Sequence, residues 1–261
     1  MRKRNLIATV AAVVMMSVNA FAMCMPSPNP NAGNDFAYYL SQLNELTNAN
    51  ETTESTLYVT PQTLNTTLAT LDDSESKIYN IHLASGTYSP ITFNDREHYV
   101  NLIGDEEGVE IVSESGTYAN PAAELRLNGT VKNITFINRH PLGVVVPRGE
   151  KGGYAVHLDY GSQDTTFENC KFISYQAAAI GAGIDSNSSL TFKNCYIANK
   201  STEEYSYHRN GAIYAHTGIG EVRAIGGDLK VINCNLEAPA DAWSTIVTDS
   251  LNGSKLRVYR A

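Results

Sequence analysis

A phrase of five or six residues recurs four times in the second half of this 261-residue chain, and it restricts the folds that the chain can adopt. Each copy places an aromatic or β-branched residue two positions before an asparagine: Ile-Thr-Phe-Ile-Asn at 134–138, Thr-Thr-Phe-Glu-Asn-Cys at 165–170, Leu-Thr-Phe-Lys-Asn-Cys at 190–195 and Leu-Lys-Val-Ile-Asn-Cys at 229–234. Phe136, Phe167, Phe192 and Val231 are successively 31, 25 and 39 residues apart. That spacing indicates a minimal unit of roughly 22 to 25 residues that carries insertions.

Such a short unit cannot bury its apolar side alone, so consecutive units must stack, and stacked coils about 4.8 Å apart form parallel sheets. From residue 78 onward, short segments rich in β-branched and aromatic residues alternate with Gly, Asn and Asp turns, and no long helical pattern appears. We therefore predict an all-β fold, a right-handed parallel β-helix with about seven coils between residues 78 and 261. A β-sandwich is the competing fold, but it does not predict one phrase recurring at one corner.

Stacking places equivalent residues of successive coils above one another. We expect an asparagine ladder at one corner, because Asn tolerates a left-handed backbone and its amide bonds to its neighbours. The members of this ladder are Asn138, Asn169, Asn194 and Asn233. The cysteines that follow align in the same way, so a Cys170–Cys195 bridge is one prediction and a stack of small buried thiols is the alternative. The cysteine spacings match no zinc pattern, and we expect no metal and no cofactor.

The first 22 residues have the pattern of a cleavable signal peptide. A basic start at 2–4 precedes an apolar run at 6–16 that is too short to span a bilayer, and Ala-Phe-Ala at 20–22 is a small-x-small cleavage site. We predict cleavage after Ala22 and a secreted or periplasmic protein. Met23 before Cys24 does not suit a lipoprotein cleavage site, so no lipid anchor is expected. The net charge of −8 disfavours nucleic acid as a partner. We expect a monomer that does not insert into a membrane.

The predicted domain organisation has three parts. Residues 1–22 are the signal peptide, 23–55 a Pro/Asn-rich tether with a short helix over 36–46, and 56–261 the β-helix. Residues 56–60 read as a strand, and Pro61 begins a helical pattern over 61–71 in which Leu64, Leu68 and Leu71 share a face. Since the first coil of a stack exposes strand edges and apolar interior, this helix is predicted to cap it.

Six segments between residues 56 and 247 carry a family resemblance through their order and spacing. They are Ile-His-Leu-Ala-Ser-Gly-Thr-Tyr at 81–88, Val-Asn-Leu-Ile-Gly at 100–104, Asn-Ile-Thr-Phe at 133–136, Tyr-Ala-Val-His-Leu at 154–158, Asn-Cys-Lys-Phe-Ile-Ser-Tyr-Gln at 169–176 and Asn-Cys-Tyr-Ile at 194–197. In this order they resemble the pectin methylesterases (pectinesterases), carbohydrate esterases whose fold is the pectin-lyase-like β-helix. The resemblance implies that fold and a polysaccharide as the partner.

The catalytic groups of that family are mostly not matched. The family uses one carboxylate as nucleophile and another as general acid, while glutamines hold the oxyanion and an arginine positions the nucleophile. Only Gln176 corresponds to this set. Ala177 stands where the first Asp is expected, Thr202 stands at the nucleophile spacing, Tyr154 replaces the first glutamine, and segment 237–240 has no arginine. Losing a covalent nucleophile costs a factor of roughly 10⁴ or more, so standard methylesterase chemistry is not expected.

Several polar and aromatic residues are candidates for binding sugar. Strand alternation places His157 with Asp159, and Tyr214 with His216, on outer faces, where a plain solvated surface is the alternative interpretation. Aromatic rings stack on sugars and Arg pairs with uronate carboxylates; on that basis the further candidates are Tyr154, Tyr175, Tyr205, Tyr207, Arg209 and Trp243. Trp243 fits a core position equally well. A basic strip for a polyuronate is predicted from Arg126, Lys132, Arg139, Arg148 and Lys151, with scattered surface cations as the alternative.

The sequence therefore predicts an exported pectinesterase-like β-helix that engages pectin or a related cell-wall or surface polysaccharide without standard esterase chemistry. One alternative is an active carbohydrate esterase, that is a carboxylic ester hydrolase, in which Glu203 or Glu204 works beside Gln176. The other is a surface scaffold that binds no glycan.

Overall fold

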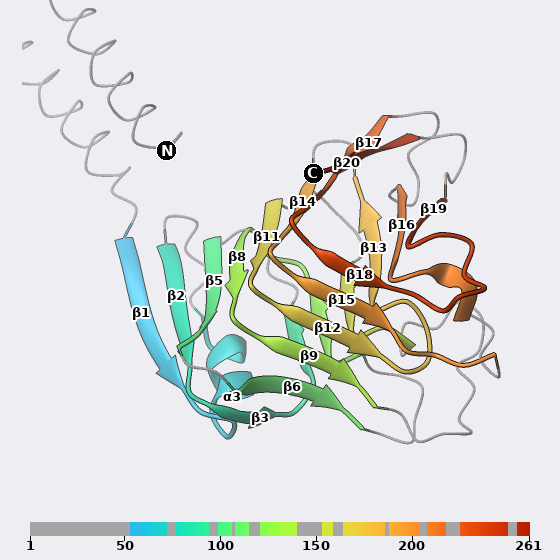
Figure 1. Cartoon of the computed structure of the whole chain (residues 1–261). Coiled ribbons are helices and arrows are strands. Elements are labelled where there is room, and N and C mark those ends of the chain that lie inside the picture. Colours follow the sequence, from blue (N-terminus) through green and yellow to red (C-terminus); the bar gives the residue numbers. More distant parts are fainter. Residues whose placement is uncertain are drawn as a thin grey trace, which may run out of the picture. The chain divides into compact units, whose positions relative to one another are not determined.

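The computed structural model of the chain is shown in Figure 1. It describes residues 53–71, 77–93, 99–105, 108–114, 121–139, 153–158, 164–185, 188–203, 208–217, 225–249 and 255–261. The predicted signal peptide, the helix expected over 36–46 and residues 23–52 of the tether lie outside these ranges. The described residues all belong to one compact unit, Thr52–Ala261.

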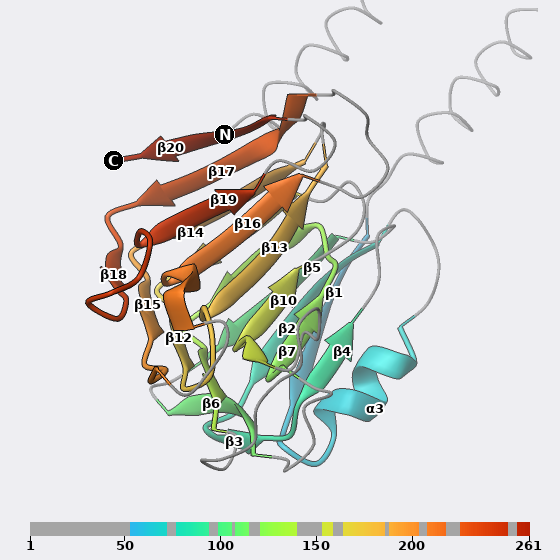
Figure 2. The ribbon, with the colours of Figure 1, turned by 90° about the vertical axis from the view of Figure 1, so that its right-hand side faces the viewer.

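Three parallel sheets form this unit, which confirms the prediction of a parallel β-helix (Figures 1 and 2). Sheet A contains, in spatial order, β1 (Thr53–Val59), β2 (Lys77–Leu83), β5 (Tyr99–Gly104), β8 (Gly129–Lys132), β11 (Asp164–Glu168), β14 (Ser189–Lys193), β17 (Ile225–Ile232) and β20 (Lys255–Arg260). Sheet B contains β3 (Gly86–Tyr88), β6 (Val109–Ser113), β9 (Thr135–Asn138), β12 (Lys171–Ser174), β15 (Tyr196–Asn199) and β18 (Asn235–Glu237). Sheet C contains β4 (Ile91–Phe93), β7 (Ala123–Leu125), β10 (Val156–Leu158), β13 (Ile180–Ile184), β16 (Ile213–Thr217) and β19 (Ile246–Asp249).

From β2 onward, the described strands succeed one another in the order A, B, C, whereas β1 is an additional strand of sheet A. From β2 to β19 they make six complete coils, and β20 begins another, close to the seven expected. β1 starts at Thr53, so residues 53–55, which the sequence pattern assigns to the tether, already pair with β2. A single turn of 3₁₀ helix, η2 (His208–Asn210), precedes β16.

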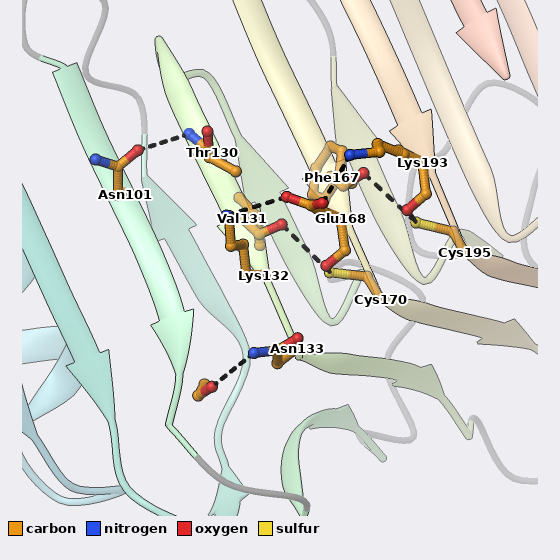
Figure 3. A network of polar contacts seen from close by, with 11 residues as sticks. Asn101, Thr130, Val131, Lys132, Asn133, Phe167, Glu168, Cys170, Lys193 and Cys195 are labelled. Atoms are coloured by element: carbon orange, nitrogen blue, oxygen red, sulfur yellow. Dashed lines mark hydrogen bonds and ion pairs between the residues drawn. The ribbon is translucent and has the colours of Figure 1, made fainter. Parts of the chain in front are cut away.

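The corner between sheets A and B is made by asparagines in the left-handed conformation. Asn133, Asn169, Asn194 and Asn233 have φ of 57°, 55°, 54° and 50°. The prediction of Asn138 in this ladder is wrong, because Val131 pairs with Phe167 and Phe136 pairs with Phe172. The phrase at 131–134, Val-Lys-Asn-Ile, is therefore the true equivalent of Phe-Glu-Asn-Cys at 167–170. Side-chain amides link coils at this corner. Asn233 Nδ2 donates to Asn194 Oδ1 at 2.8 Å. Asn133 Nδ2 donates to the Gly104 carbonyl at 3.2 Å, a hydrogen bond that Figure 3 shows.

Phenylalanines from two sheets interlock in the core. Phe167 and Phe192 of sheet A stack at 5.2 Å between ring centroids, and Phe136 and Phe172 of sheet B stack at 5.3 Å. Rings of the two sheets meet edge to face, as Phe167 and Phe172 do at 5.2 Å and 82°. All four side chains are fully buried. Sheets A and B thus each contribute an aromatic column to the core, and three of the four rings, Phe136, Phe167 and Phe192, come from the repeated phrase.

The helix α3 (Leu64–Ala69) lies beside the first complete coil and caps it (Figure 2). Leu64 and Leu68 are buried in the core, Leu71 packs against it, and Asn65 Nδ2 donates to the Pro90 carbonyl at 3.5 Å. The helix is shorter than the predicted 61–71. Its start is delayed by a turn at Pro61, in which the N–H groups of Thr63 and Leu64 both donate to the Thr60 carbonyl.

The described cysteines form the stack of thiols and not the Cys170–Cys195 bridge. Cys170, Cys195 and Cys234 are free and occupy one position in three consecutive coils. The thiols of Cys170 and Cys195 donate to the carbonyls of Val131 and Phe167 in the preceding coils, at 3.5 and 3.6 Å (Figure 3).

On the outer face of sheet A, Glu168 bridges two lysines of neighbouring strands (Figure 3). Its carboxylate lies 2.9 Å from Lys193 Nζ and 3.0 Å from Lys132 Nζ. Hydrogen bonds from Lys193 and then Lys132 hold the pKa of Glu168 below its ordinary value.

A folded-state pKa below the unfolded value makes the contribution of Glu168 to stability pH-dependent. The contribution is complete above the unfolded pKa and is lost as the pH falls through the lower folded pKa. We expect Glu168→Gln to lower the free energy of unfolding by about 1 kcal/mol or less at pH 7, and the difference to vanish well below pH 4. Urea titrations of both proteins across this range measure it. A difference that grows as the pH falls contradicts the lysine bridge.

Candidate functional site

Three of the described candidate residues, His157, Tyr214 and His216, lie on strands of sheet C, whose strands face the viewer in Figure 2. Strand register aligns Thr92, Glu124, His157, Gly181, Tyr214 and Val247 in one row across six strands. A second row, two residues further along each strand, contains Gly183, His216 and Asp249. The sequence-based placement of His157, Tyr214 and His216 on an outer face therefore agrees with the register. Asp159 lies outside the described residues.

A compact group surrounds His157. Its Nδ1 lies 3.7 Å from Glu124 Oε1 on the neighbouring strand β7, and the Tyr154 ring stacks on the imidazole with centroids 5.9 Å apart and 9° between planes. The exposed fraction of His157 is only 8%, so this is not a plain solvated position. A Cβ on Gly181 would lie 2.5 Å from Tyr154 Cε2, which shows that the glycine leaves room for the tyrosine ring across β13.

Tyr154 is positioned by polar residues buried at the corner between sheets B and C. Asn138, Ser174 and Asn199 are aligned at the ends of three successive B strands. Asn138 Nδ2 donates to the Tyr154 carbonyl at 2.9 Å, Ser174 Oγ to the Gly153 carbonyl at 2.6 Å, and Asn199 Nδ2 to the Gly211 carbonyl at 2.9 Å. Asn138 thus fixes the backbone that presents Tyr154, a role different from the one predicted.

A second group lies two strands further along the same face. Tyr214 Oη donates to Asp249 Oδ2 at 3.2 Å, and the rings of Tyr214 and His216 are 6.1 Å apart and tilted by 53°. We call the two groups together the sheet C ladder; it consists of Glu124, Tyr154, His157, Tyr214, His216 and Asp249. Sequence reasoning missed both of its carboxylates. The alternation in Ala-Glu-Leu at 123–125 is the signal that marks Glu124 as outward-facing.

The predicted catalytic residues are not arranged as an esterase pair. Gln176 is 1% exposed and Ala177 is 2% exposed, and the backbone N–H groups of both donate to Ser174 Oγ. Glu203 lies at the surface after β15 and makes no hydrogen bond or ion pair with the described residues. Thr202, at the nucleophile spacing, is also exposed. Glu204, Tyr205 and Tyr207 lie outside the described ranges.

Trp243 is at the surface and not in the core, since 70% of it is exposed. Its backbone N–H donates to the Arg209 carbonyl at 3.1 Å, and Arg209 Nε lies 3.2 Å from Asp241 Oδ2. Among the candidate aromatic residues that the structure describes, Tyr175 is also exposed, at 40%. Arg209 is therefore already neutralised by a carboxylate of its own chain.

The described members of the predicted basic strip do not lie together as a continuous strip. Lys132 belongs to sheet A and is bonded to Glu168, Arg139 follows sheet B and lies 3.7 Å from Glu114, and Arg126 follows β7. Arg148 and Lys151 lie outside the described residues. Parallel coils carry residues that are close in sequence to different walls, so these cations are separated.

The sheet C ladder offers two imidazoles, two phenols and two carboxylates within five adjacent strands. Such groups bind hydroxyls by hydrogen bonds and sugar rings by stacking. Within the described part of the chain, no three His, Cys, Asp or Glu side chains come together as metal ligands, and no helix is long and apolar enough to cross a membrane. No family model, curated protein or solved structure matches this chain.

Proposed function

We propose that this chain is an exported β-helix protein that binds a polysaccharide along the outer face of sheet C and does not hydrolyse esters. The observation that carries this proposal is the sheet C ladder. The group at His157 on β10 and the group at Tyr214 on β16 are two strand spacings apart, about 9.6 Å. Because His157 is 8% exposed and Tyr154 stacks on it, an extended oligosaccharide would contact the first group through Tyr154 and the second through Tyr214.

The charges on the ladder favour an uncharged glycan. Glu124 and Asp249 each place a carboxylate on this face, whereas Lys132 and Arg139 of the predicted basic strip belong to other walls and are paired with Glu168 and Glu114. A polyuronate with free carboxylates is repelled by such a surface, whereas methyl-esterified pectin and neutral cell-wall glycans are not. Highly methyl-esterified pectin is therefore the first ligand to test, which also agrees with the resemblance to pectin methylesterases.

We expect Tyr214→Ala to weaken binding of highly methyl-esterified pectin about tenfold, since it removes both the ring and the phenol that contacts Asp249. Affinity electrophoresis and calorimetry with the full chain measure the change. Tyr58→Ala is the matched control, because Tyr58 lies on sheet A and is 76% exposed. Equal effects of the two substitutions contradict a site on sheet C.

The alternatives give different results in the same experiments. Methanol released from methylated pectin above the blank, and abolished by Glu203→Gln, would establish the esterase. A wild-type chain that retains no pectin or neutral glycan would favour the scaffold. The buried Gln176 and the exposed Glu203 give the esterase no geometric support.

A further inference from the structure

We propose that Cys195 and Cys234 form a disulfide in the folded, exported protein, with Cys170 left as a thiol. Cys195 and Cys234 occupy the same position in adjacent coils, next to the paired strands β15 and β18. The backbone N–H of Cys195 donates to Cys234 Sγ at 3.4 Å, so the Cys234 sulfur lies directly against the Cys195 backbone. Adjacent coils hold Cα atoms within the range that a disulfide requires.

The solvent exposure of the thiols favours the Cys195–Cys234 pair over the Cys170–Cys195 pair. Cys170 and Cys195 are 1% and 3% exposed, whereas Cys234, in the last complete coil, is only partly buried. An external oxidant therefore reaches Cys234 first. Cys195 is one coil away from it, while Cys170 is two coils away, about 9.6 Å, which is beyond disulfide range.

The reaction is a thiol–disulfide exchange with a low-molecular-weight disulfide such as oxidised glutathione. The Cys234 thiolate attacks one sulfur, forms a mixed disulfide and releases one thiol. The Cys195 thiolate then attacks Cys234 Sγ, forms the bridge and releases the second thiol. Two electrons pass from the cysteine pair to the oxidant, and the two protons end on the released thiols.

The raised pKa values of the stacked thiols predict that the Cys195–Cys234 disulfide forms slowly and is also reduced slowly. Hydrogen bonding with Cys170, together with burial, raises the pKa of Cys195 to about 12, and hydrogen bonding with Cys195, together with burial, raises the pKa of Cys234. Because little of either cysteine is present as thiolate at neutral pH, thiol–disulfide exchange is slow. A bridge between two thiols of high pKa also has poor leaving groups, and reduction is slow for the same reason.

The disulfide would link the last complete coil covalently to the coil before it. α3 covers the first complete coil, whereas Leu236, Ile246 and Leu256 at the other end remain only partly buried. Cross-linking residues 39 apart removes conformational freedom from the unfolded chain. We expect the oxidised protein to melt roughly 5–10 °C above the reduced protein.

Peptide mapping of the full chain tests this pairing without any substitution. Reduced, folded protein is incubated with oxidised glutathione, alkylated and digested with trypsin without reductant. The three cysteines fall in separate tryptic peptides, 152–171, 194–200 and 231–255. We expect 194–200 linked to 231–255, with 152–171 alkylated. A link between 152–171 and 194–200, a link to Cys24, or three alkylated peptides would overturn the proposal.

Two variants separate the bridge from simple packing. Cys170→Ala is expected to keep the difference in melting temperature between oxidised and reduced protein, and Cys234→Ala is expected to abolish it. Loss of the difference in both variants, with the wild-type link absent, contradicts the pairing. Glycan binding does not enter either measurement, so the result is independent of the proposed function.

Discussion

Phe167→Ala is expected to cost about 3–5 kcal/mol of unfolding free energy. The Phe167 ring is fully buried and contacts three other phenylalanines: it stacks on Phe192 at 5.2 Å and meets Phe136 and Phe172 edge to face at 6.3 and 5.2 Å. Truncation removes the transfer energy of the ring and leaves a cavity where two aromatic columns cross. Equilibrium unfolding in urea, followed by circular dichroism, measures the change.

Thr166→Ala is the matched control in the same strand. Thr166 points outward beside Thr130 and Thr191, so its loss is expected to cost less than about 1 kcal/mol. If Phe167→Ala costs no more than Thr166→Ala, the aromatic columns do not stabilise the coils as described.

Ala177→Asp is expected to destabilise the chain by about 3 kcal/mol or more at pH 7, and to restore no esterase activity. Ala177 is 2% exposed and lies between Gln176 and Ala178, which are 1% and 0% exposed. A carboxylate placed there loses its hydration, and burial raises its pKa above the usual value of about 3.9.

The pH dependence distinguishes charge from volume. Ala177→Asn has the same shape without the charge and is the control. Because the folded-state pKa of the introduced Asp is raised, its penalty is complete when the pH exceeds that value, and it is gone below the unfolded pKa. The two variants should therefore differ at pH 7 and converge near pH 3. Equal stability at pH 7, or release of methanol by the Asp variant, would show that position 177 is open to a catalytic acid.

The repeated phrase was enough to predict the parallel β-helix, since a unit of that length must stack to bury its apolar side. It was not enough to set the register of the first copy. Thr-Phe at 135–136 reads like Thr-Phe at 166–167, but the first belongs to sheet B and the second to sheet A. The same dipeptide fits a strand of either sheet, because inward and outward residues alternate with a period of two in both sheets. The left-handed conformation of Asn133 and the pairing of Val131 with Phe167 reveal the true corner.

The sheet C ladder could be predicted only in part. The alternation within one strand placed His157 and Tyr214 outward, but nothing local reports that Glu124 lies beside His157 or that Asp249 accepts from Tyr214. These partners are 33 and 35 residues apart in the sequence, and insertions of different length separate the coils. Which side chains meet depends on how the insertions loop out, which the repeat spacing does not specify.

The asparagine corner also determines how coils can be added to this protein or removed from it. Four successive A-to-B connections have the same length of two residues, at 133–134, 169–170, 194–195 and 233–234, while the described connections at the other two corners vary. A cut between Asn169 and Cys170 and another between Asn194 and Cys195 bracket one whole turn of 25 residues. Removal or duplication of that turn keeps a two-residue A-to-B connection at the new junction, so the number of coils can change in whole-turn steps.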